Sequence, residues 1–404
     1  MDWRNRVGRY GSYFLGMAAI GFTLPYLPLY LGEKGLSDRA IGWISTLAAL
    51  SGLAQFPVGL WSDRIGWRKL FLVVALAGAA ISTLLLRNAQ GVVWLTFVVV
   101  LFAENGICRA VMESLSGSEA ASLAPKGEVG AALGALRFWK PIGIILTALA
   151  GSWMSERYGI GAILLPLAVV QGLAVAAALL IHENSGPSRS RLDLRLNQEA
   201  GEAKTAASRF PKDAGLWAFV AAMVLYHAAN APGGVYLGLF LKRDLHAPDR
   251  LLAYTFAVSM VAWMFVVRPA GRLADRWGRK PLLIAGWAIM TLRLGLVALV
   301  HDPWMAVANQ ALDGLGNGLF AVIAAAWVTD RLADPRRSGE AQVIVGCCLV
   351  LGSAIGPAVS GYLVEPLGYR GLFAALAGLG VVATAVVVFF VPETLTKSLE
   401  HLEV

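Results

Sequence analysis

The chain has 404 residues, of which 57% are hydrophobic and only 15% are charged, and its formal net charge is +8. A soluble globular chain carries about 25% charged residues and cannot hide so much apolar surface in one core. The composition therefore excludes an ordinary soluble domain and requires that lipid form part of the protein's solvent.

Apolar runs of roughly twenty residues recur along the whole chain, and each is long enough, at about 1.5 Å per residue, to cross a hydrocarbon layer of about 30 Å. They predict an all-α membrane protein with twelve transmembrane helices. No short leader with a small-residue cleavage site precedes the first run, so we expect a retained helix there. The predicted spans are 10–31, 40–61, 69–87, 92–114, 129–153, 160–181, 214–241, 251–270, 281–300, 304–329, 339–364 and 369–391.

The placement of basic residues supports this prediction, because Lys and Arg concentrate in short cytoplasmic loops. Twelve spans put both termini on one side of the membrane. If that side is the cytoplasm, it holds 21 of the 34 Lys and Arg residues, the opposite side holds 8, and 5 lie inside spans. We therefore expect an integral multi-pass protein of the cytoplasmic (inner) membrane with both termini in the cytoplasm. Nucleic-acid binding is a poor explanation for the positive charge.

The longest polar segment divides the predicted helices into two sets of six. We expect a six-helix bundle at 1–181, a cytoplasmic linker at 182–213, a second six-helix bundle at 214–391 and a cytoplasmic tail at 392–404. An internal repeat supports this division, since a loop that closes the second helix of one half recurs 212 residues later. The repeated and basic positions are Gly59, Asp63, Arg64, Gly66 and Arg68 in the first copy and Gly271, Asp275, Arg276, Gly278 and Arg279 in the second.

Both copies resemble the loop signature of the major facilitator superfamily, Gly-x-x-x-Asp-Arg-x-Gly followed by basic residues. The resemblance covers the whole chain and implies two pseudo-symmetric bundles that move a solute by alternating access. It also implies that Asp63, Arg64, Asp275 and Arg276 belong to a conformational latch between the halves. Anchoring of the topology on anionic lipid explains the flanking basic residues equally well.

Ionisable side chains inside the spans are the candidates for transport chemistry, because each buried Arg, Lys or Asp costs about 2.5–3.5 kcal/mol on insertion scales. Such a cost is tolerated where carboxylates or water meet the charge. Counted in helical turns, Glu104 and Lys140 lie near the middle of the membrane, while Arg109 and Glu113 share one helical face closer to the cytoplasm. The predicted network between spans four and five comprises Glu104, Arg109, Glu113, Glu119, Arg137 and Lys140.

This network has two interpretations. In the functional one, Glu104 or Glu113 exchanges a proton as the cavity alternates sides, and the cations tune that carboxyl or meet an anionic or hydroxylated solute. In the structural one, the ions are permanently paired and only fix helix register. The second half adds Arg293 and Asp313, which we expect to pair across neighbouring helices.

Aromatic and polar side chains are expected to line the cavity. Span seven carries several of them around Pro232-Gly233-Gly234, where we expect a break in the helix, and unwound backbone at that depth is tolerated only against protein or water. His227 can titrate near neutral pH, but a lone histidine is more often a hydrogen-bonded core residue. The predicted cavity residues are Phe22, Tyr26, Trp139, Tyr226, His227, Asn230, Trp263 and Asn317.

The aromatic and proline-rich stretch Gly21–Tyr30 looks like span one of the lactose permease branch of the superfamily, and the eighteen-residue interval between Glu119 and Arg137 is a further similarity. The resemblance implies uptake of a sugar-like or anionic solute that these two side chains hold. The permease's proton-coupling His and Glu on helix ten are replaced here by Asp313 and Gly316, which argues against lactose itself.

Efflux is the alternative within the same class. Span eleven contains Gly352-x-x-x-Gly356-Pro357-x-x-x-Gly361, which is close to the Gly-Pro motif that drug/proton antiporters carry in helix five. Small-residue spacing of this kind usually serves helix packing, so the pattern does not set the direction of transport.

An enzyme is not expected, because the chain shows no nucleophile elbow, no Walker loop and no metal-spaced His/Cys set. No cofactor and no metal are expected. We predict a monomeric secondary transporter for a small-molecule solute, with protons as the coupling ion, membrane lipid around it and no nucleic-acid partner. A non-transporting sensor or a lipid translocator on the same scaffold is the remote alternative.

Overall fold

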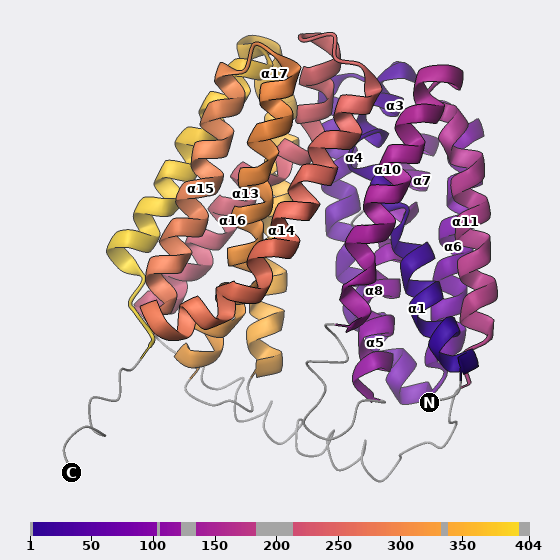
Figure 1. Ribbon diagram of the computed structural model, residues 1–404, viewed down its shortest axis with the longest axis horizontal. Helices are drawn as coiled ribbons and strands as arrows, with labels where there is room; N and C mark the ends of the chain where they lie inside the picture. The colour runs from indigo at the N-terminus through magenta and orange to yellow at the C-terminus, as the bar shows by residue number, and fades with distance from the viewer. Residues whose placement is uncertain (1–2, 103–105, 123–134, 183–212, 333–337, 396–404) are drawn as a thin grey trace.

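The computed structural model describes residues 3–102, 106–122, 135–182, 213–332 and 338–395 (Figure 1). Within these ranges, the description leaves out the side chains of residues 56, 59–60, 63–64, 102, 117–122 and 338–343. Every regular element in the described part of the chain is a helix. Helices satisfy all their backbone hydrogen bonds internally, as a lipid-embedded chain requires.

Seven helices of the described chain are long and apolar enough to cross a membrane, or eight if the bent pair at the N-terminus forms one span. All the helices fall into two groups that stand side by side in Figure 1. The N-terminal group comprises α1 (Trp3–Met17), α2 (Ile20–Thr23), α3 (Leu27–Glu33), α4 (Asp38–Ser51), η1 (Gly52–Ala54), α5 (Gln55–Ile65), α6 (Arg68–Asn88), α7 (Val92–Phe102), α8 (Ile107–Ser122), α10 (Trp139–Tyr158), η2 (Ile160–Ile163) and α11 (Leu164–Leu179). The C-terminal group comprises α13 (Ala214–Arg243), α14 (Asp249–Trp277), α15 (Arg279–Leu299), α16 (Pro303–Arg331) and α17 (Ser338–Phe390).

The two ends of the molecule differ in how closely the groups approach. The described chain begins with α1 and ends after α17 at the lower end in Figure 1, which we call the terminal end, and the opposite end is the distal end. The groups come together at the distal end and diverge toward the terminal end (Figure 1).

Local sequence signals set several helix ends. Ser37 caps α4 by accepting a hydrogen bond from the Ala40 N–H at 3.3 Å, which satisfies one of the free donors of the first turn. Gly66 ends α5 with φ 77°, and Gly278 ends α14 with φ 101°. Both values lie in the region that favours glycine, so the repeated glycine of the loop motif is a helix stop in each group.

Three predicted spans have irregular backbones. Span one bends by 50° between Trp3–Thr23 and Leu27–Glu33, because Pro25 and Pro28 remove backbone donors at that point. Span two is divided into α4, η1 and α5. Spans eleven and twelve follow each other within α17, where Gly368 at φ 65° separates them. The twelve-span, two-bundle arrangement stays a prediction, because several described helices are too short to cross a membrane alone.

The break predicted at Pro232 in span seven is wrong. Helix α13 runs unbroken from Ala214 to Arg243 with the proline inside it. The proline leaves one carbonyl of the preceding turn without its usual donor, and here Gly356 of α17 packs directly on the Ala228 carbonyl and the Pro232 ring. A close neighbour of this kind explains why a membrane helix tolerates the proline.

Three hydrophobic clusters form the core. One lies mainly in the N-terminal group around Leu76 and Met112, and a second lies in the C-terminal group around Trp287 and Trp327. The third joins the two groups and buries Tyr26 completely, together with residues of α13, α14 and the distal turns. Apolar packing therefore connects the groups mainly at the distal end.

Helices α16 and α14 pack closely at Gly314. A Cβ at this position would lie 2.7 Å from both the Ala262 Cβ and the Trp263 backbone nitrogen, whereas a Cβ on Gly378 would meet nothing within 4 Å. Gly314→Ala is therefore expected to lower the free energy of unfolding by about 1–3 kcal/mol through overpacking. Thermal unfolding in detergent measures the effect, and Gly378→Ala, the matched control, should leave the melting temperature unchanged or slightly raised.

Candidate functional site

A set of polar contacts joins the two groups at the distal end, and we call it the distal seal. Asp38, in the first turn of α4, accepts hydrogen bonds from Arg243 Nη1 at 2.9 and 3.1 Å and from the Tyr369 hydroxyl at 3.1 Å. Arg243 also donates to the Tyr369 hydroxyl at 2.7 Å. The other members are Arg39 with Glu365, Trp43 with Tyr362, Thr46 with the Ala354 carbonyl, Tyr236 with the Asp38 and Pro357 carbonyls, Ser155 with Asp249, and Glu156 with the Arg250 N–H.

The backbones of the two groups also touch within the distal seal. A Cβ on Gly361 of α17 would lie 2.9 Å from the Arg39 Cα and from the Asp38 carbonyl oxygen of α4. The hydrogen bonds and ion pairs described between the two groups all lie toward the distal end. In this conformation the molecule is therefore closed between the groups at that end.

Side chains of α8 and α10 form a partly buried charge cluster in the N-terminal group. Glu113 accepts hydrogen bonds from Arg109 Nη2 at 2.7 Å and from Lys140 Nζ at 2.9 and 3.0 Å. The exposed fractions of the three side chains are 13% for Arg109, 27% for Glu113 and 26% for Lys140. Arg137 is exposed one turn before Lys140. The structure thus brings three members of the predicted network together on two neighbouring helices.

The described part of this cluster is rich in positive charge. Two cations contact one carboxylate, and a third cation lies one turn away. Charges in a partly buried site are screened less than charges in water, so these cations interact strongly with the negative and polar groups that contact them. Four predicted network or latch residues lie outside the described residues or side chains, namely Glu104, Glu119, Asp63 and Arg64.

A second ion pair lies inside the C-terminal group. Arg293 of α15 pairs with Asp313 of α16, and the carboxylate also accepts hydrogen bonds from Ser259 at 2.6 Å and Asn317 at 3.1 Å. Arg293 is only 3% exposed, and its guanidinium packs against Gly233 of α13. The pairing predicted for Arg293 and Asp313 is therefore present in the structure.

Four of the predicted cavity residues are packed in this conformation. Phe22 and Tyr26 are fully buried in the cluster that joins the groups. Tyr226 and His227 are also buried, and His227 packs edge-on against Phe320 with 4.8 Å between ring centroids. The other predicted cavity residues are exposed or half-buried, namely Trp139, Asn230, Trp263 and Asn317.

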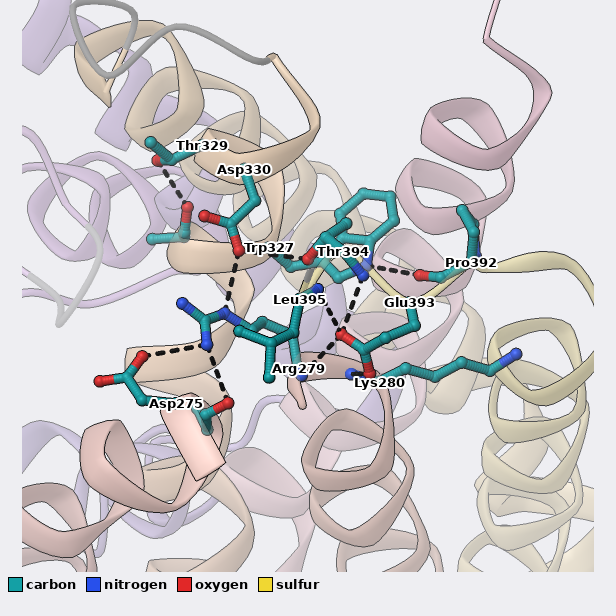
Figure 2. Close-up of polar contacts among 12 residues, drawn as sticks. Asp275, Arg279, Lys280, Trp327, Thr329, Asp330, Pro392, Glu393, Thr394 and Leu395 are labelled. Carbon is teal, nitrogen blue, oxygen red and sulfur yellow. Dashed lines mark hydrogen bonds and ion pairs between the residues drawn. The ribbon is translucent and has the colours of Figure 1, made fainter. Parts of the chain in front are cut away.

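The second copy of the repeated loop is held within the C-terminal group at the terminal end (Figure 2). Arg279 pairs with Asp275 at 3.0 Å and with Asp330 of α16 at 2.9 Å. The Glu393 carboxylate, which follows α17, accepts hydrogen bonds from the backbone N–H groups of Arg279 and Lys280, both at 2.9 Å. A carboxylate at this position stabilises the free donors and the dipole of the α15 N-terminus.

The latch predicted for Asp275 and Arg276 has no described contact with the N-terminal group. Asp275 is 69% exposed and pairs within its own loop, and Arg276 is exposed. Their role between the halves stays a prediction.

Sequence reasoning missed the charged residues that join helix ends, including Asp38, Arg243, Asp249 and Glu393. In the sequence, Lys242 and Arg243 indicated only the orientation of the chain in the membrane. A charged residue at the end of a span is also typical of a water-facing loop, so its position does not indicate a contact. The acidic residues at helix starts were a usable signal, since Asp38 and Asp249 each begin a helix.

The Arg293–Asp313 pair can be tested by a double-mutant cycle. Arg293→Ala leaves the Asp313 carboxylate buried without its partner, which is expected to cost about 3–5 kcal/mol of stability. The double variant Arg293→Ala/Asp313→Ala removes both charges, so its loss should be smaller than the sum of the single losses. Thermal unfolding in detergent gives all four values, and strictly additive losses would contradict the pairing.

Glu393 makes stability at the terminal end depend on pH. Burial raises the pKa of the Glu393 carboxyl, but four backbone N–H donors, from Leu395, Arg279, Lys280 and Thr394, outweigh burial and hold the pKa below its usual range. The ionised form therefore stabilises the fold above the unfolded pKa of about 4.3, and this stabilisation is lost as the pH falls through the lower folded pKa.

Glu393→Gln should lower the free energy of unfolding at neutral pH by about 1 kcal/mol, the usual value of a helix cap, and should flatten its dependence on acidic pH. Melting temperatures measured across that pH range check both effects. Asp244→Asn, which neutralises an exposed carboxylate at the distal end, is the control and should keep the wild-type pH profile. An unchanged acid profile in Glu393→Gln would refute the assignment.

Comparison with known proteins places this geometry in a family. Residues 10–375 match the family model described as MFS_1 like family. An uncharacterised MFS-type transporter of Mycobacterium tuberculosis is 28% identical over 388 residues, which cover 92% of this chain and 89% of the relative. The multidrug resistance protein MdtG of Salmonella dublin is 25% identical over 396 residues, which cover 94% of this chain and 93% of the relative.

Solved structures share the fold. The crystal structure of the nucleoside transporter NupG superimposes with a TM-score of 0.74 and 16% identity, over 96% of this chain and 98% of that one. The inward open conformation of the xylose transporter XylE from E. coli gives a TM-score of 0.70 and 17% identity, over 99% of this chain and 98% of that one. At these identities the likeness concerns the fold alone.

Proposed function

The chain belongs to the MFS_1 like family, and from that premise we propose that it moves a small organic solute across the membrane by alternating access, driven by protons. It is a membrane transporter of the major facilitator superfamily and not an enzyme. The observation that carries the proposal is the distal seal, because the groups are joined by polar contacts at one end only among the described residues. An asymmetric closure of this kind is what alternating access requires.

The moving parts in this proposal are two six-helix halves, 1–181 and 214–391, joined by the linker 182–213 and followed by the tail 392–404. The excess of Lys and Arg on the side of the termini supports a cytoplasmic terminal end in the inner membrane. The distal seal then faces outside, and the conformation described here is inward-facing. Each monomer is a complete transporter with lipid around it.

Proton coupling is supported by the cluster around Glu113. This carboxylate is partly buried between Arg109 and Lys140. A proton that binds to the carboxylate, or an anion that binds to the cations, therefore weakens the contact between Glu113 and the two cations. Arg137, which is exposed one turn from Lys140, can bind a solute with a carboxylate or several hydroxyls. Binding of such a solute can release Glu113 to accept a proton.

Proton-driven efflux of a drug or metabolite is the second candidate. The observation that favours it is the full-length similarity to the multidrug resistance protein MdtG. In an efflux cycle the same carboxylate exchanges its proton for the solute. The two candidates differ in solute chemistry and in the direction of proton movement.

A stability screen followed by a flux assay tests these alternatives. Melting temperature is measured with sugars and polyols, organic anions and lipophilic cations at acidic and at alkaline pH. The solutes that stabilise the protein are then tested in sealed proteoliposomes, with solute flux and internal pH recorded together. Solute flux without proton movement would overturn the coupling, and binding without flux would favour the sensor alternative.

Glu113→Gln should reduce proton-driven flux at least about tenfold, because it removes the charge between the two cations while an oxygen acceptor remains. Arg137→Ala should weaken binding of an anionic solute without unfolding the protein. Asp244→Asn is the control and should transport normally. If Glu113→Gln instead lowers the melting temperature and leaves coupled flux intact, the cluster has only a structural role.

A further inference from the structure

Tyr13 of α1 is buried beside the charge cluster of the N-terminal group. It is only 2% exposed, and it belongs to the hydrophobic cluster that also contains Met112 and Leu136. These two residues directly precede Glu113 and Arg137 in the sequence. The tyrosine ring is therefore part of the apolar packing behind the charged side chains.

The packing of α1 fixes the position of Tyr13. A Cβ on Gly16, one turn after Tyr13, would lie 3.5 Å from the Met112 sulfur of α8. A Cβ on Gly143 of α10 would lie 2.9 Å from the Phe14 carbonyl oxygen. The turn of α1 that carries Tyr13 therefore touches both helices that form the charge cluster.

The Tyr13 hydroxyl is a polar group that the described contacts leave unused. It is buried and has no hydrogen-bond partner among the residues that the structure describes, although the charges of Glu113, Arg109 and Arg137 are close enough to act on it. Such a hydroxyl lowers stability, because it loses its hydrogen bonds to water and gains none in return. Most buried polar groups in native proteins are paired, so this one requires an explanation.

Tyr226 repeats this arrangement in the C-terminal group. It is also 2% exposed, its hydroxyl likewise has no partner in the described part of the chain, and the charges of Asp313 and Arg293 act on it. Tyr226 follows Tyr13 by 213 residues, and the loop motif repeats after 212. A buried tyrosine beside an acid–arginine pair thus recurs with the repeat, which makes an accident of packing in one half a poor explanation.

Glu113 can accept more hydrogen bonds than its two cations supply. An ionised carboxylate has about four acceptor sites, and Glu113 accepts from Arg109 Nη2 and Lys140 Nζ. In the proposed function a solute draws these cations away, which leaves a partly buried carboxylate with fewer donors. A neutral O–H group that already lies at the cluster can replace a lost donor without adding charge.

We propose that Tyr13 is a positioning residue for transport, whose hydroxyl donates a hydrogen bond to Glu113 when a bound solute takes over Lys140. This inference rests on the solute-binding role proposed above for the Glu113 cluster, and it adds the residue that stabilises the solute-bound arrangement. One hydrogen bond from Lys140 is replaced by one from Tyr13, and no covalent bond changes. The solute is one that accepts hydrogen bonds from Lys140, through a carboxylate or several hydroxyls.

A double-mutant cycle tests the contact without any solute. Lys140→Met removes one cation from Glu113 and so imitates the arrangement in which a solute has taken it. In the parent protein Tyr13→Phe should leave the melting temperature unchanged or raise it, because the hydroxyl has no partner to lose. In the Lys140→Met background the same substitution should lower the melting temperature by about 3 °C or more, because it then removes a hydrogen bond to a charged acceptor.

Tyr10→Phe is the matched control, since it removes a hydroxyl from a half-buried side chain of the same helix. It should have the same small effect in both backgrounds. If Lys140→Met does not fold, Arg109→Met removes the other cation and provides the second background. Equal effects of Tyr13→Phe in the two backgrounds would overturn the proposal and leave the tyrosine with a packing role only.

D-Gluconate, a carboxylate with several hydroxyls, tests the role of Tyr13 in solute binding. The concentration that gives half of the maximal rise in melting temperature should be about tenfold higher for Tyr13→Phe than for the parent protein and Tyr10→Phe. An equal concentration for all three proteins would refute this role.

Failure of this inference and failure of the proposed function have different signatures. Flux without proton movement in proteoliposomes refutes the proton coupling, and a parent protein that D-gluconate does not stabilise refutes an anionic solute. Neither result changes the double-mutant cycle, which is measured without solute or gradient. Additive effects in that cycle, with coupled flux intact, refute only the Tyr13 contact.

Discussion

A charge inside this bundle is stable only where an opposite charge or a hydrogen-bond donor meets it, because lipid and packed side chains cannot replace water. Glu113 lies between Arg109 and Lys140 for this reason, and Arg293 lies against Asp313. The same constraint provides a switch. A buried charge can lose its partner only when a proton or a solute takes the place of that partner. The energy of an ion gradient can therefore be linked to a change in helix contacts.

The two ends of the molecule use their polar contacts differently. At the distal end, contacts such as Asp38 with Arg243 join one group to the other. At the terminal end, the described contacts of Arg279 and Glu393 hold helices of one group together. Stable groups with a breakable connection are what rigid-body rocking needs, since each half must keep its shape while the contacts between halves change.

Much of the fold was readable from the sequence, because a lipid-facing helix must be apolar over a known length. The predicted proximity of Arg109, Glu113 and Lys140 follows from helical spacing within and between two adjacent spans. The prediction of a break at Pro232 was wrong. Whether a proline breaks a membrane helix depends on the residues packed against it, and the packing of Gly356 on the Ala228 carbonyl is visible in the tertiary structure but not in the sequence. The position of Asp249 at a helix start was readable from the sequence, but its contact with Ser155, 94 residues earlier in α10, was not.

The sequence by itself determined the solvent, the helical class, the repeat and the family, because each depends on composition or on spacing along one chain. The tertiary structure alone decided which charges meet between the two groups, which end is closed and which predicted cavity residues are packed away. Tyr26 could face a cavity or a core with equal ease, and its burial follows from the approach of the two groups. Contacts between distant segments depend on the relative position of whole helices, which no local pattern encodes.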